Sequence, residues 1–263
     1  MGSATTQALA ASVETLNAQQ VDLDTARQLF AAAHALGDST QLASALADSA
    51  APVAARQQVV QAVFAGSLGA SALTVLASAA SQRWSSPADL VDGVEELAIR
   101  AASAADAADL EGELFQFSRV VAANPDLELT LNSRRGDAQR KGELIDTILG
   151  AKASQGTVAI IRSLVAQTRG RRVRQLLQHA MNIVAAQRGR QVATVTSAQA
   201  LTAAQLERLG GALSAKYGRT VTLNPVVDPS VIGGLRVQIA DDVIDGSLSS
   251  RLADLRQQLV GAH

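Results

Sequence analysis

A change in the spacing of apolar residues at Gly189 constrains the fold more than any other feature. Before Gly189, apolar residues recur every three or four positions, the spacing of amphipathic helices. The stripes are Leu29, Ala33 and Leu36; Val59, Val60, Val63 and Phe64; Leu90, Val94 and Leu97; Leu110, Leu114, Phe117 and Val121; Leu144, Ile145, Ile148 and Leu149; and Val173, Leu176, Leu177, Ala180, Ile183 and Val184. After Gly189, Val192, Thr194 and Thr196 alternate with their neighbours, which indicates a strand. The sequence predicts a mainly α chain, with an N-terminal helical bundle followed by a small C-terminal α/β module.

Glycine and proline mark several expected helix ends. Gly37 follows the first stripe as a C-terminal cap, and Pro87 is placed to begin a helix. The uncharged run between Arg56 and Arg83 is long enough to span a membrane, but Gly66-Ser67 interrupts it. We therefore expect two buried helices there instead of a membrane span. The first residues carry no Lys or Arg before their apolar positions, so no secretory signal is predicted.

The C-terminal module carries cap and turn signals. Thr202 and Gln205 form a capping box that opens a helix, and Gly218 ends it. Pro225 lies in the next strand, which places that strand at a sheet edge because proline donates no ladder hydrogen bond. A third strand covers residues 235–239, and Asp241-Asp242 makes a tight turn into Val243-Ile244. Ser247 then caps a terminal helix whose apolar stripe is Leu248, Leu252, Leu255 and Leu259.

The helical part contains an internal repeat with an offset of 85 residues. The matched pairs are Leu29 and Leu114, Phe30 and Phe115, Leu42 and Leu127, Leu46 and Leu131, Arg56 and Lys141, Val59 and Leu144, Val60 and Ile145, and Val63 and Ile148. Two unrelated bundles can share some phase by chance, but one register held over several helices favours duplication. We therefore place a first helical repeat at residues 1–104, a second helical domain at 105–189 and the α/β module at 190–263.

Charge divides the chain, although its net charge is only −1. Up to Leu110 there are eleven acidic and four basic residues, a net of −7; from Glu111 there are thirteen acidic and nineteen basic residues, a net of +6. Such a chain can meet two partners with different surfaces, or its own halves can attract each other. The sequence leaves both readings open.

Catalytic and metal-binding signals are missing from the sequence. It has no cysteine, its three histidines are far apart, and no glycine is followed by lysine as a phosphate-binding loop requires. Asp241 and Asp242 could act as acid and base, but adjacent carboxylates in a turn are more often a solvated tip. We predict no enzyme activity, no catalytic residue, no metal and no cofactor.

An arginine cluster is the main signal for a different function. It comprises Arg169, Arg171, Arg172 and Arg174, with Arg162 upstream and Arg188 and Arg190 downstream. Such a stripe could neutralise phosphates of a nucleic acid. No aromatic residue lies between Phe117 and Tyr217 to stack on bases, and the sequence pI is about 6.3. We favour an ordinary helix start that pairs with acidic groups, so no nucleic-acid partner is predicted.

The stretch from Pro229 to Leu259 resembles the delta subunit of F-type ATP synthases, a family that includes the mitochondrial oligomycin-sensitivity-conferring protein. The resemblance rests on the residues Pro229, Ile232, Gly233, Gly234, Asp245, Gly246, Ser247, Arg251 and Leu252 in this order and spacing. The helical stretch from about Leu110 to Gly189, including Thr168-Arg169-Gly170-Arg171, also resembles the family. No tyrosine precedes Tyr217, whereas shorter members begin with a Tyr-Ala helix, and the extra length resembles enlarged bacterial forms with a duplicated helical domain.

The resemblance implies a stator role without chemistry. In this family the helical domain binds N-terminal segments of the alpha subunits of the catalytic head. The C-terminal module binds the b subunit of the peripheral stalk, so that proton flow is coupled to ATP synthesis. We expect a peripheral protein at the cytoplasmic face of the bacterial plasma membrane, held there only through the complex. The alternatives are a nucleic-acid-binding adaptor and a generic helical scaffold.

Overall fold

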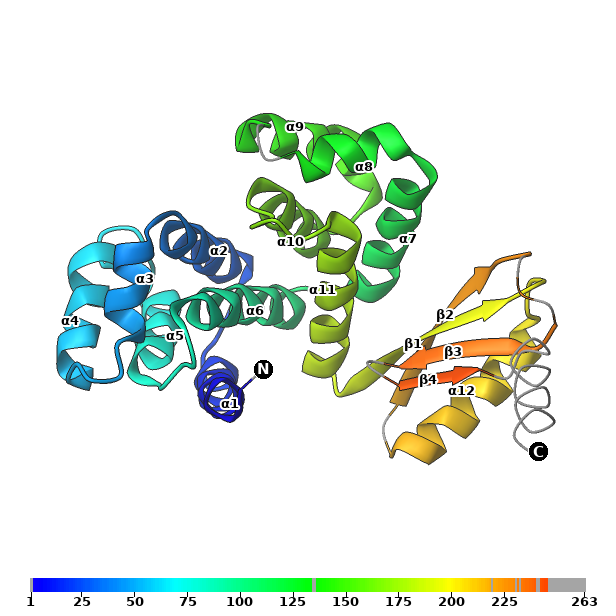
Figure 1. The fold of residues 1–263 in the computed structure, drawn as a ribbon, viewed down its shortest axis with the longest axis horizontal. Coiled ribbons are helices and arrows are strands. Elements are labelled where there is room, and N and C mark those ends of the chain that lie inside the picture. Colours follow the sequence, from blue (N-terminus) through cyan, green and yellow to red (C-terminus); the bar gives the residue numbers. More distant parts are fainter. Residues whose placement is uncertain are drawn as a thin grey trace, which may run out of the picture. The chain divides into compact units, whose positions relative to one another are not determined.

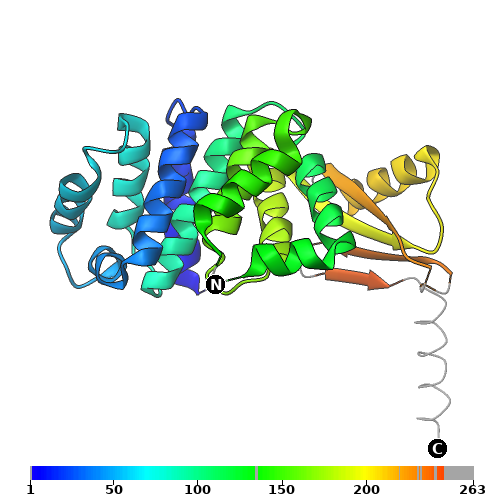
Figure 2. The ribbon, with the colours of Figure 1, turned by 90° about the horizontal axis from the view of Figure 1, so that it is seen from above.

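The computed structural model describes residues 2–133, 136–218, 220–229, 231, 233–239 and 242–245. The chain forms two compact units, residues 1–184 and residues 185–263. Each unit has its own hydrophobic core. Figures 1 and 2 show a first unit built from helices and a second built from a sheet with a helix against it. The mainly α fold and the small α/β module are confirmed.

The helical unit contains the following elements among the described residues: α1 (Ser3–Asn17), α2 (Leu23–Asp38), α3 (Thr40–Ala47), α4 (Val53–Phe64), α5 (Ala70–Ser81), α6 (Pro87–Ala105), α7 (Leu110–Ala123), α8 (Pro125–Asn132), α9 (Ala138–Leu149), the short 3-10 helix η1 (Gly150–Lys152), α10 (Gln155–Ala166) and α11 (Val173–Gln187). Side-chain caps begin several of them. Ser86 accepts a hydrogen bond from the backbone N–H of Asp89, and Pro87 is the first residue of α6, as expected.

Two expectations about local structure are wrong. Gly37 does not end α2, which continues to Asp38, because Ser39 accepts a hydrogen bond from Leu42 N and thereby sets the start of α3. Val63 is 50% exposed, because the buried stripe of α4 consists of Arg56, Val60 and Phe64.

The uncharged run forms two separate helices, α4 and α5, as expected. In the part of the chain that the structure describes, no helix combines the length and the apolar character needed to cross a membrane.

The 85-residue repeat reappears in the helix boundaries. Moved by 85 positions, α3, α4 and α5 coincide in both bounds with α8, α9 and α10, and α2 overlaps α7. The same shift places α1 inside α6 and α6 over α11. Thus α6 is both the sixth helix of a first bundle (α1–α6) and the first helix of a second bundle (α6–α11). The residue pairs matched in the sequence do not include residues of α1 and α6.

Packing within the two bundles follows the same order. Contacts of α1 with α5, α2 with α3 and α4 with α5 recur as contacts of α6 with α10, α7 with α8 and α9 with α10. The matched residues Leu29 and Leu114 are both fully buried. These observations support duplication of the helical part. The predicted division of the chain at residues 104 and 189 stays a prediction. Residue 104 lies at the end of the shared helix α6. The boundary between the two compact units lies between Val184 and Ala185.

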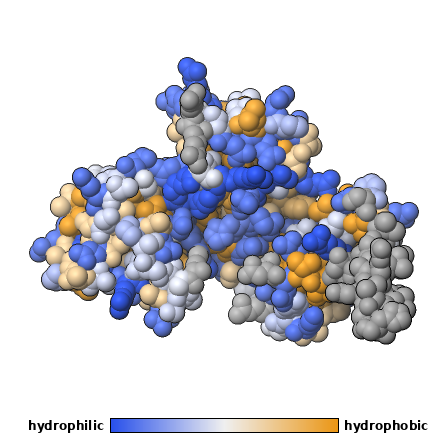
Figure 3. All heavy atoms as spheres, in the orientation of Figure 1, coloured by the Kyte–Doolittle hydropathy of each residue, from blue (hydrophilic) through white to orange (hydrophobic). Residues whose placement is uncertain are grey.

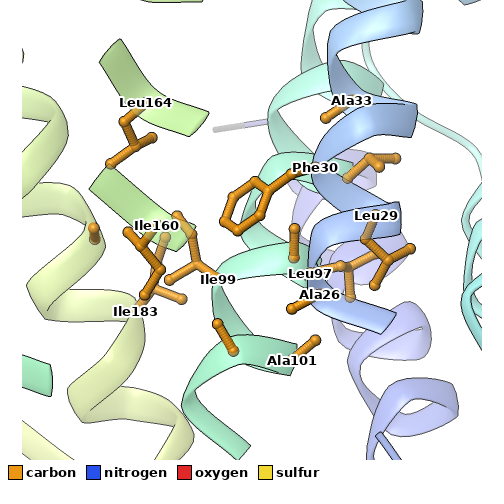
Figure 4. Packing of buried hydrophobic residues seen from close by; sticks show 14 of the residues in the cluster. Ala26, Leu29, Phe30, Ala33, Leu97, Ile99, Ala101, Ile160, Leu164 and Ile183 are labelled. Carbon is orange, nitrogen blue, oxygen red and sulfur yellow. The ribbon is translucent and has the colours of Figure 1, made fainter. Parts of the chain in front are cut away.

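The helical core centres on α6, which is packed against α1, α2, α3 and α5 of the first bundle and against α10 of the second. Figure 4 shows its Leu97, Ile99 and Ala101 between α2 and α10. Small residues such as Ala26 and Ala33 of α2 line this contact and are fully buried. They let the helix axes approach closely, since the distance between packed helices depends on the side chains at the contact.

The second unit contains β1 (Arg190–Ser197), α12 (Ala203–Tyr217), β2 (Thr220–Val227), β3 (Leu235–Ile239) and β4 (Asp242–Asp245). The sheet order is β2-β1-β3-β4; β1 and β2 are parallel, and the other pairs are antiparallel. The expected capping box and the left-handed cap at Gly218 are present at the ends of α12. Pro225 lies in β2 at an edge of the sheet, as expected. The predicted terminal helix from Ser247 lies outside the described residues.

Because Leu29 and Leu114 are equivalent and fully buried, we expect Leu29→Ala and Leu114→Ala each to lower the free energy of unfolding by about 2–5 kcal/mol. Leu129→Ala is the control, since Leu129 is 74% exposed, and it should change stability by less than about 0.5 kcal/mol. Urea unfolding monitored by circular dichroism measures all three. A negligible loss for either core variant would contradict the equivalence of the two bundles.

Candidate partner-binding surfaces

Among the described residues, no three or more His, Asp or Glu side chains gather where they could hold a metal ion. His34 lies on α2, where Nε2 is 3.1 Å from the carbonyl oxygen of Ser163 and 3.0 Å from its Oγ. Burial lowers the pKa of His34, which favours the neutral imidazole, and the side chain is a contact between α2 and α10.

Two members of the arginine cluster are bound within the chain. Arg169 Nη2 lies 2.7 Å from Asp92 and 2.8 Å from Glu95, and both carboxylates belong to α6. Arg171 Nη2 donates to both carboxylate oxygens of Glu95 at 2.8 and 2.9 Å. Only 4% of the Glu95 side chain is exposed. For these residues the structure favours attraction between the acidic and basic halves over a nucleic-acid surface.

The backbone at this ion-pair cluster is unusual. Arg169 has φ +49°, and the following Gly170 has φ +80°. A left-handed conformation costs a non-glycine residue about 1 kcal/mol. Burial lowers the pKa of the Arg169 guanidinium, while Glu95 and Asp92 act in the opposite direction. The two carboxylates therefore hold a half-buried cation and a strained loop in place against α6.

A buried cation occupies the same repeat position in both bundles. Arg56 donates to the carbonyl oxygens of Ala80 and Gln82, just at and beyond the end of α5. Lys141 donates to the carbonyl oxygens of Leu131, Ser133 and Val165, at 3.0, 2.6 and 3.3 Å. Ala80 and Val165 are themselves 85 positions apart. Each cation satisfies free carbonyl groups near the end of the fifth helix of its bundle. Burial lowers the pKa of Lys141.

Two surface grooves also occupy equivalent positions. The α4–α5 groove, of about 450 Å³, is lined by Thr15, Gln57, Gln61, Leu73, Thr74, Ala77, Ser78 and Ser81. All of these except Thr15 have their 85-residue equivalents in the α9–α10 groove, of about 660 Å³: Gly142, Asp146, Val158, Ala159, Arg162, Ser163 and Ala166. The α9–α10 groove has an additional wall formed by Arg27, Phe30, Ala31 and His34 of α2. On the face that Figure 3 shows, hydrophobic and hydrophilic side chains are interspersed over the helical unit.

The predicted motif residues of the C-terminal module are only partly described. Pro229 is exposed just after β2. Gly233 and Gly234 have φ +65° and +80° directly before β3, so the expected backbone bend is present. Asp245 ends β4, and its partner in the ladder is Arg236, two residues after Gly234. The structure thus brings Gly234 and Asp245 to one end of the sheet. Ile232, Gly246, Ser247, Arg251 and Leu252 lie outside the described residues.

The buried ion pairs should contribute far more to stability than exposed ones. Glu95→Gln keeps the size of the side chain but removes the charge shared by Arg169 and Arg171, so we expect a loss of about 3 kcal/mol. Asp146→Asn is the matched control, because the Arg162–Asp146 pair is about half exposed and should contribute less than about 1 kcal/mol. Denaturant unfolding of both variants tests this difference, and equal losses would show that the buried cluster has no special role.

Comparison with known proteins identifies the family. A model of the family described as ATP synthase delta (OSCP) subunit matches residues 96–259. The chain is 49% identical to the ATP synthase subunit delta of Leifsonia xyli subsp. xyli, covering 99% of this chain and 100% of that one. It is 38% identical to the ATP synthase subunit delta of Streptomyces avermitilis, covering 97% of each. A chain of the Toxoplasma gondii mitochondrial ATP synthase hexamer has a TM-score of 0.41 and 16% identity, covering 63% of this chain and 95% of that one.

The family model starts within α6, so it covers most of the second bundle and the C-terminal module. The Leifsonia and Streptomyces relatives also align with the first bundle, since nearly the whole chain is covered. The alignments with these relatives therefore span both bundles of this chain. The chain belongs to the ATP synthase delta (OSCP) family, and it is a non-catalytic, peripheral stator subunit of the ATP synthase complex, linking the catalytic head to the peripheral stalk.

Proposed function

We propose that the two compact units bind the two ends of the stator linkage. The helical unit would bind N-terminal segments of the alpha subunits of the head, and the α/β unit would bind the b subunit of the stalk. The observation that carries this proposal is the division of the chain into two units with separate hydrophobic cores. A linker under load has to hold two partners at once, and two cores allow each contact to form without disturbing the other.

The helical unit is suited to the head because it can resist deformation. Its bundles share α6, whose Leu90, Val94 and Leu97 are fully buried, and its ion pairs join α6 to the loop after α10. A body with one continuous core has few places to bend, since packed interiors are dense and transmit strain.

The α/β unit is proposed as the stalk-binding end. One face of its sheet is covered by α12, through the cluster of Leu213 with Val195, Val221 and Val237. The alternation of strands turns the other face away from α12. We propose that b contacts this unit at the end of the sheet near Gly234 and Asp245. We further propose that the motif residues take part in binding b: Pro229, Ile232, Gly233, Gly234, Asp245, Gly246, Ser247, Arg251 and Leu252.

The proposed location follows from these partners. The protein would lie at the cytoplasmic face of the bacterial plasma membrane as a peripheral component and be associated with the membrane only through the complex. Its coupling role would then be mechanical: it stops the head from turning with the rotor.

Replacing Gly234 with valine tests the assignment of the two ends. A β-branched residue at φ +80° should cost about 1–3 kcal/mol locally and disturb the start of β3. We expect stalk binding and coupled ATP synthesis to fall, while binding to the head and ATP hydrolysis by the head continue. Pull-down with the b subunit and with the isolated head measures the two contacts separately.

Gly211→Val is the matched control, because Gly211 lies inside α12 with open space around the position of a Cβ atom. This variant should bind both partners normally. If Gly234→Val instead keeps its affinity for the stalk and loses the head, the partners are assigned to the wrong units.

A further inference from the structure

The α9–α10 groove differs from its equivalent in the first bundle in the charges that line it. The α4–α5 groove is lined by uncharged side chains. The equivalent positions that differ most are Gln57, Gln61 and Ala77 in the α4–α5 groove and Gly142, Asp146 and Arg162 in the α9–α10 groove. The second bundle thus combines a repeated fold with charged groups of its own at this surface.

The charged pair of the α9–α10 groove is not part of the core. Arg162 Nη1 donates to Asp146 Oδ2 at 2.7 Å, and both side chains are about half exposed. Such a pair contributes little to stability, because water screens it. A Cβ atom at position 142 would lie 3.1 Å from Arg162 Nη2, so Gly142 leaves room for the guanidinium group over α9. These three residues therefore shape the surface of the groove.

Helix α2 adds a second cation to the groove. Arg27 is exposed, and its Nη2 atom lies 3.4 Å from Oε1 of Gln155, which is a neutral partner. The ion pairs found among the described residues do not include Arg27. With Arg162 and Asp146, the groove has two cationic side chains and one anionic side chain, so it attracts acidic groups.

The shape of the groove suits a helix. Its lining residues on α10 run from Gln155 to Ala166, the full 12 residues of that helix, which is about 18 Å or three turns. Helix α9 forms one wall and α2 the other, and short side chains such as Ala31, Ala138 and Ala159 lie along the three helices. Short side chains let the axis of an additional helix approach closely.

We propose that the α9–α10 groove binds an acidic amphipathic helix of another polypeptide, with small apolar residues against α10 and carboxylates paired with Arg27 and Arg162. Arg27 lies beside Gln155, and Arg162 follows Gln155 by seven residues, so the two cations are about 10 Å apart along α10. Two acidic residues seven positions apart on the bound helix therefore meet both cations. The inference goes beyond the proposed function and does not depend on which unit binds the head.

Titration of a fluorescent peptide with the full-length chain tests the inference. The probe is an alanine-rich helical peptide with two Glu residues seven positions apart, and the matched peptide has Gln at both positions. We expect fluorescence anisotropy to show that the Glu peptide binds at least about tenfold more tightly, and that added salt reduces the difference. Equal affinities of the two peptides, or no measurable binding of the Glu peptide, would overturn the inference.

Variants of the chain place the binding in the groove. Arg27→Glu and Arg162→Glu should each weaken binding of the Glu peptide at least about tenfold. Arg140→Glu is the matched control, because it makes the same change of charge at an exposed position of α9 that does not line the groove. It should change the affinity by less than about twofold, and circular dichroism checks that all three variants are folded. Equal effects of the three variants would contradict the proposed location.

Asp146→Asn gives a result that a purely structural role of the groove would not produce. Asp146 holds Arg162 within the chain, so its replacement frees the guanidinium group and removes a negative charge from the groove. We expect this variant to bind the Glu peptide at least about threefold more tightly than the unmodified chain does. Unchanged or weaker binding would contradict the pairing with Arg162, and tighter binding of duplex DNA than of the Glu peptide would contradict the assigned occupant.

Discussion

The burial of α6 on both sides is the constraint on which the helical unit depends. A helix at the edge of a bundle fully buries only one stripe, as α1 does with Thr5, Ala8, Ser12 and Leu16. Helix α6 instead buries residues all around its circumference, including Leu90, Val94, Leu97 and Ile99, all fully buried. It can do so because it closes the first bundle and opens the second. Each bundle lacks a complete core without it, so the two bundles form one compact unit instead of two domains joined by a linker.

A helix that is buried on both sides can hold a charged side chain only if that charge is paired. Glu95 is almost completely buried on α6, and an unpaired carboxylate there would cost several kcal/mol. Arg169 and Arg171 supply two cations, and the left-handed backbone at Arg169 and Gly170 accompanies their contact with Glu95. At this cluster, the acidic half and the basic half of the chain attract each other. The acidic shared helix is bound by the basic loop of the second bundle.

Much of this architecture could be predicted from the sequence because it depends on local signals. Pro87, the capping box at Thr202 and the edge position of Pro225 each follow from the chemistry of a few neighbouring residues. The repeat was visible where both copies carry large apolar residues, as at Leu29 and Leu114. The repeat is not visible between α1 and α6. Exposed Ala10 and Glu14 of α1 correspond to buried Glu95 and Ile99 of α6, and equivalent positions that differ in burial also differ in polarity. The pairing of Glu95 with Arg169 joins residues 74 positions apart and leaves no periodic trace in the sequence. In the candidate site, the bend at Gly233-Gly234 could be predicted from the sequence because positive φ favours glycine. The partner-binding surfaces could not, because they depend on which surfaces the packing of other helices leaves uncovered.

The sharing of α6 explains why a six-helix bundle recurs with a period of 85 residues. A tandem copy with its own six helices would need a longer period and a linker between two finished surfaces. Here the first bundle consists of five helices of its own, α1 to α5, and takes α6, the first helix of the second bundle, as its sixth. The shared helix α6 is the first helix of the second bundle, and its outer face is buried. The corresponding face of α1, the first helix of the first bundle, is mostly exposed. Among the described residues, the positions that are mostly exposed on α1 are therefore buried on α6, where the two bundles share a helix.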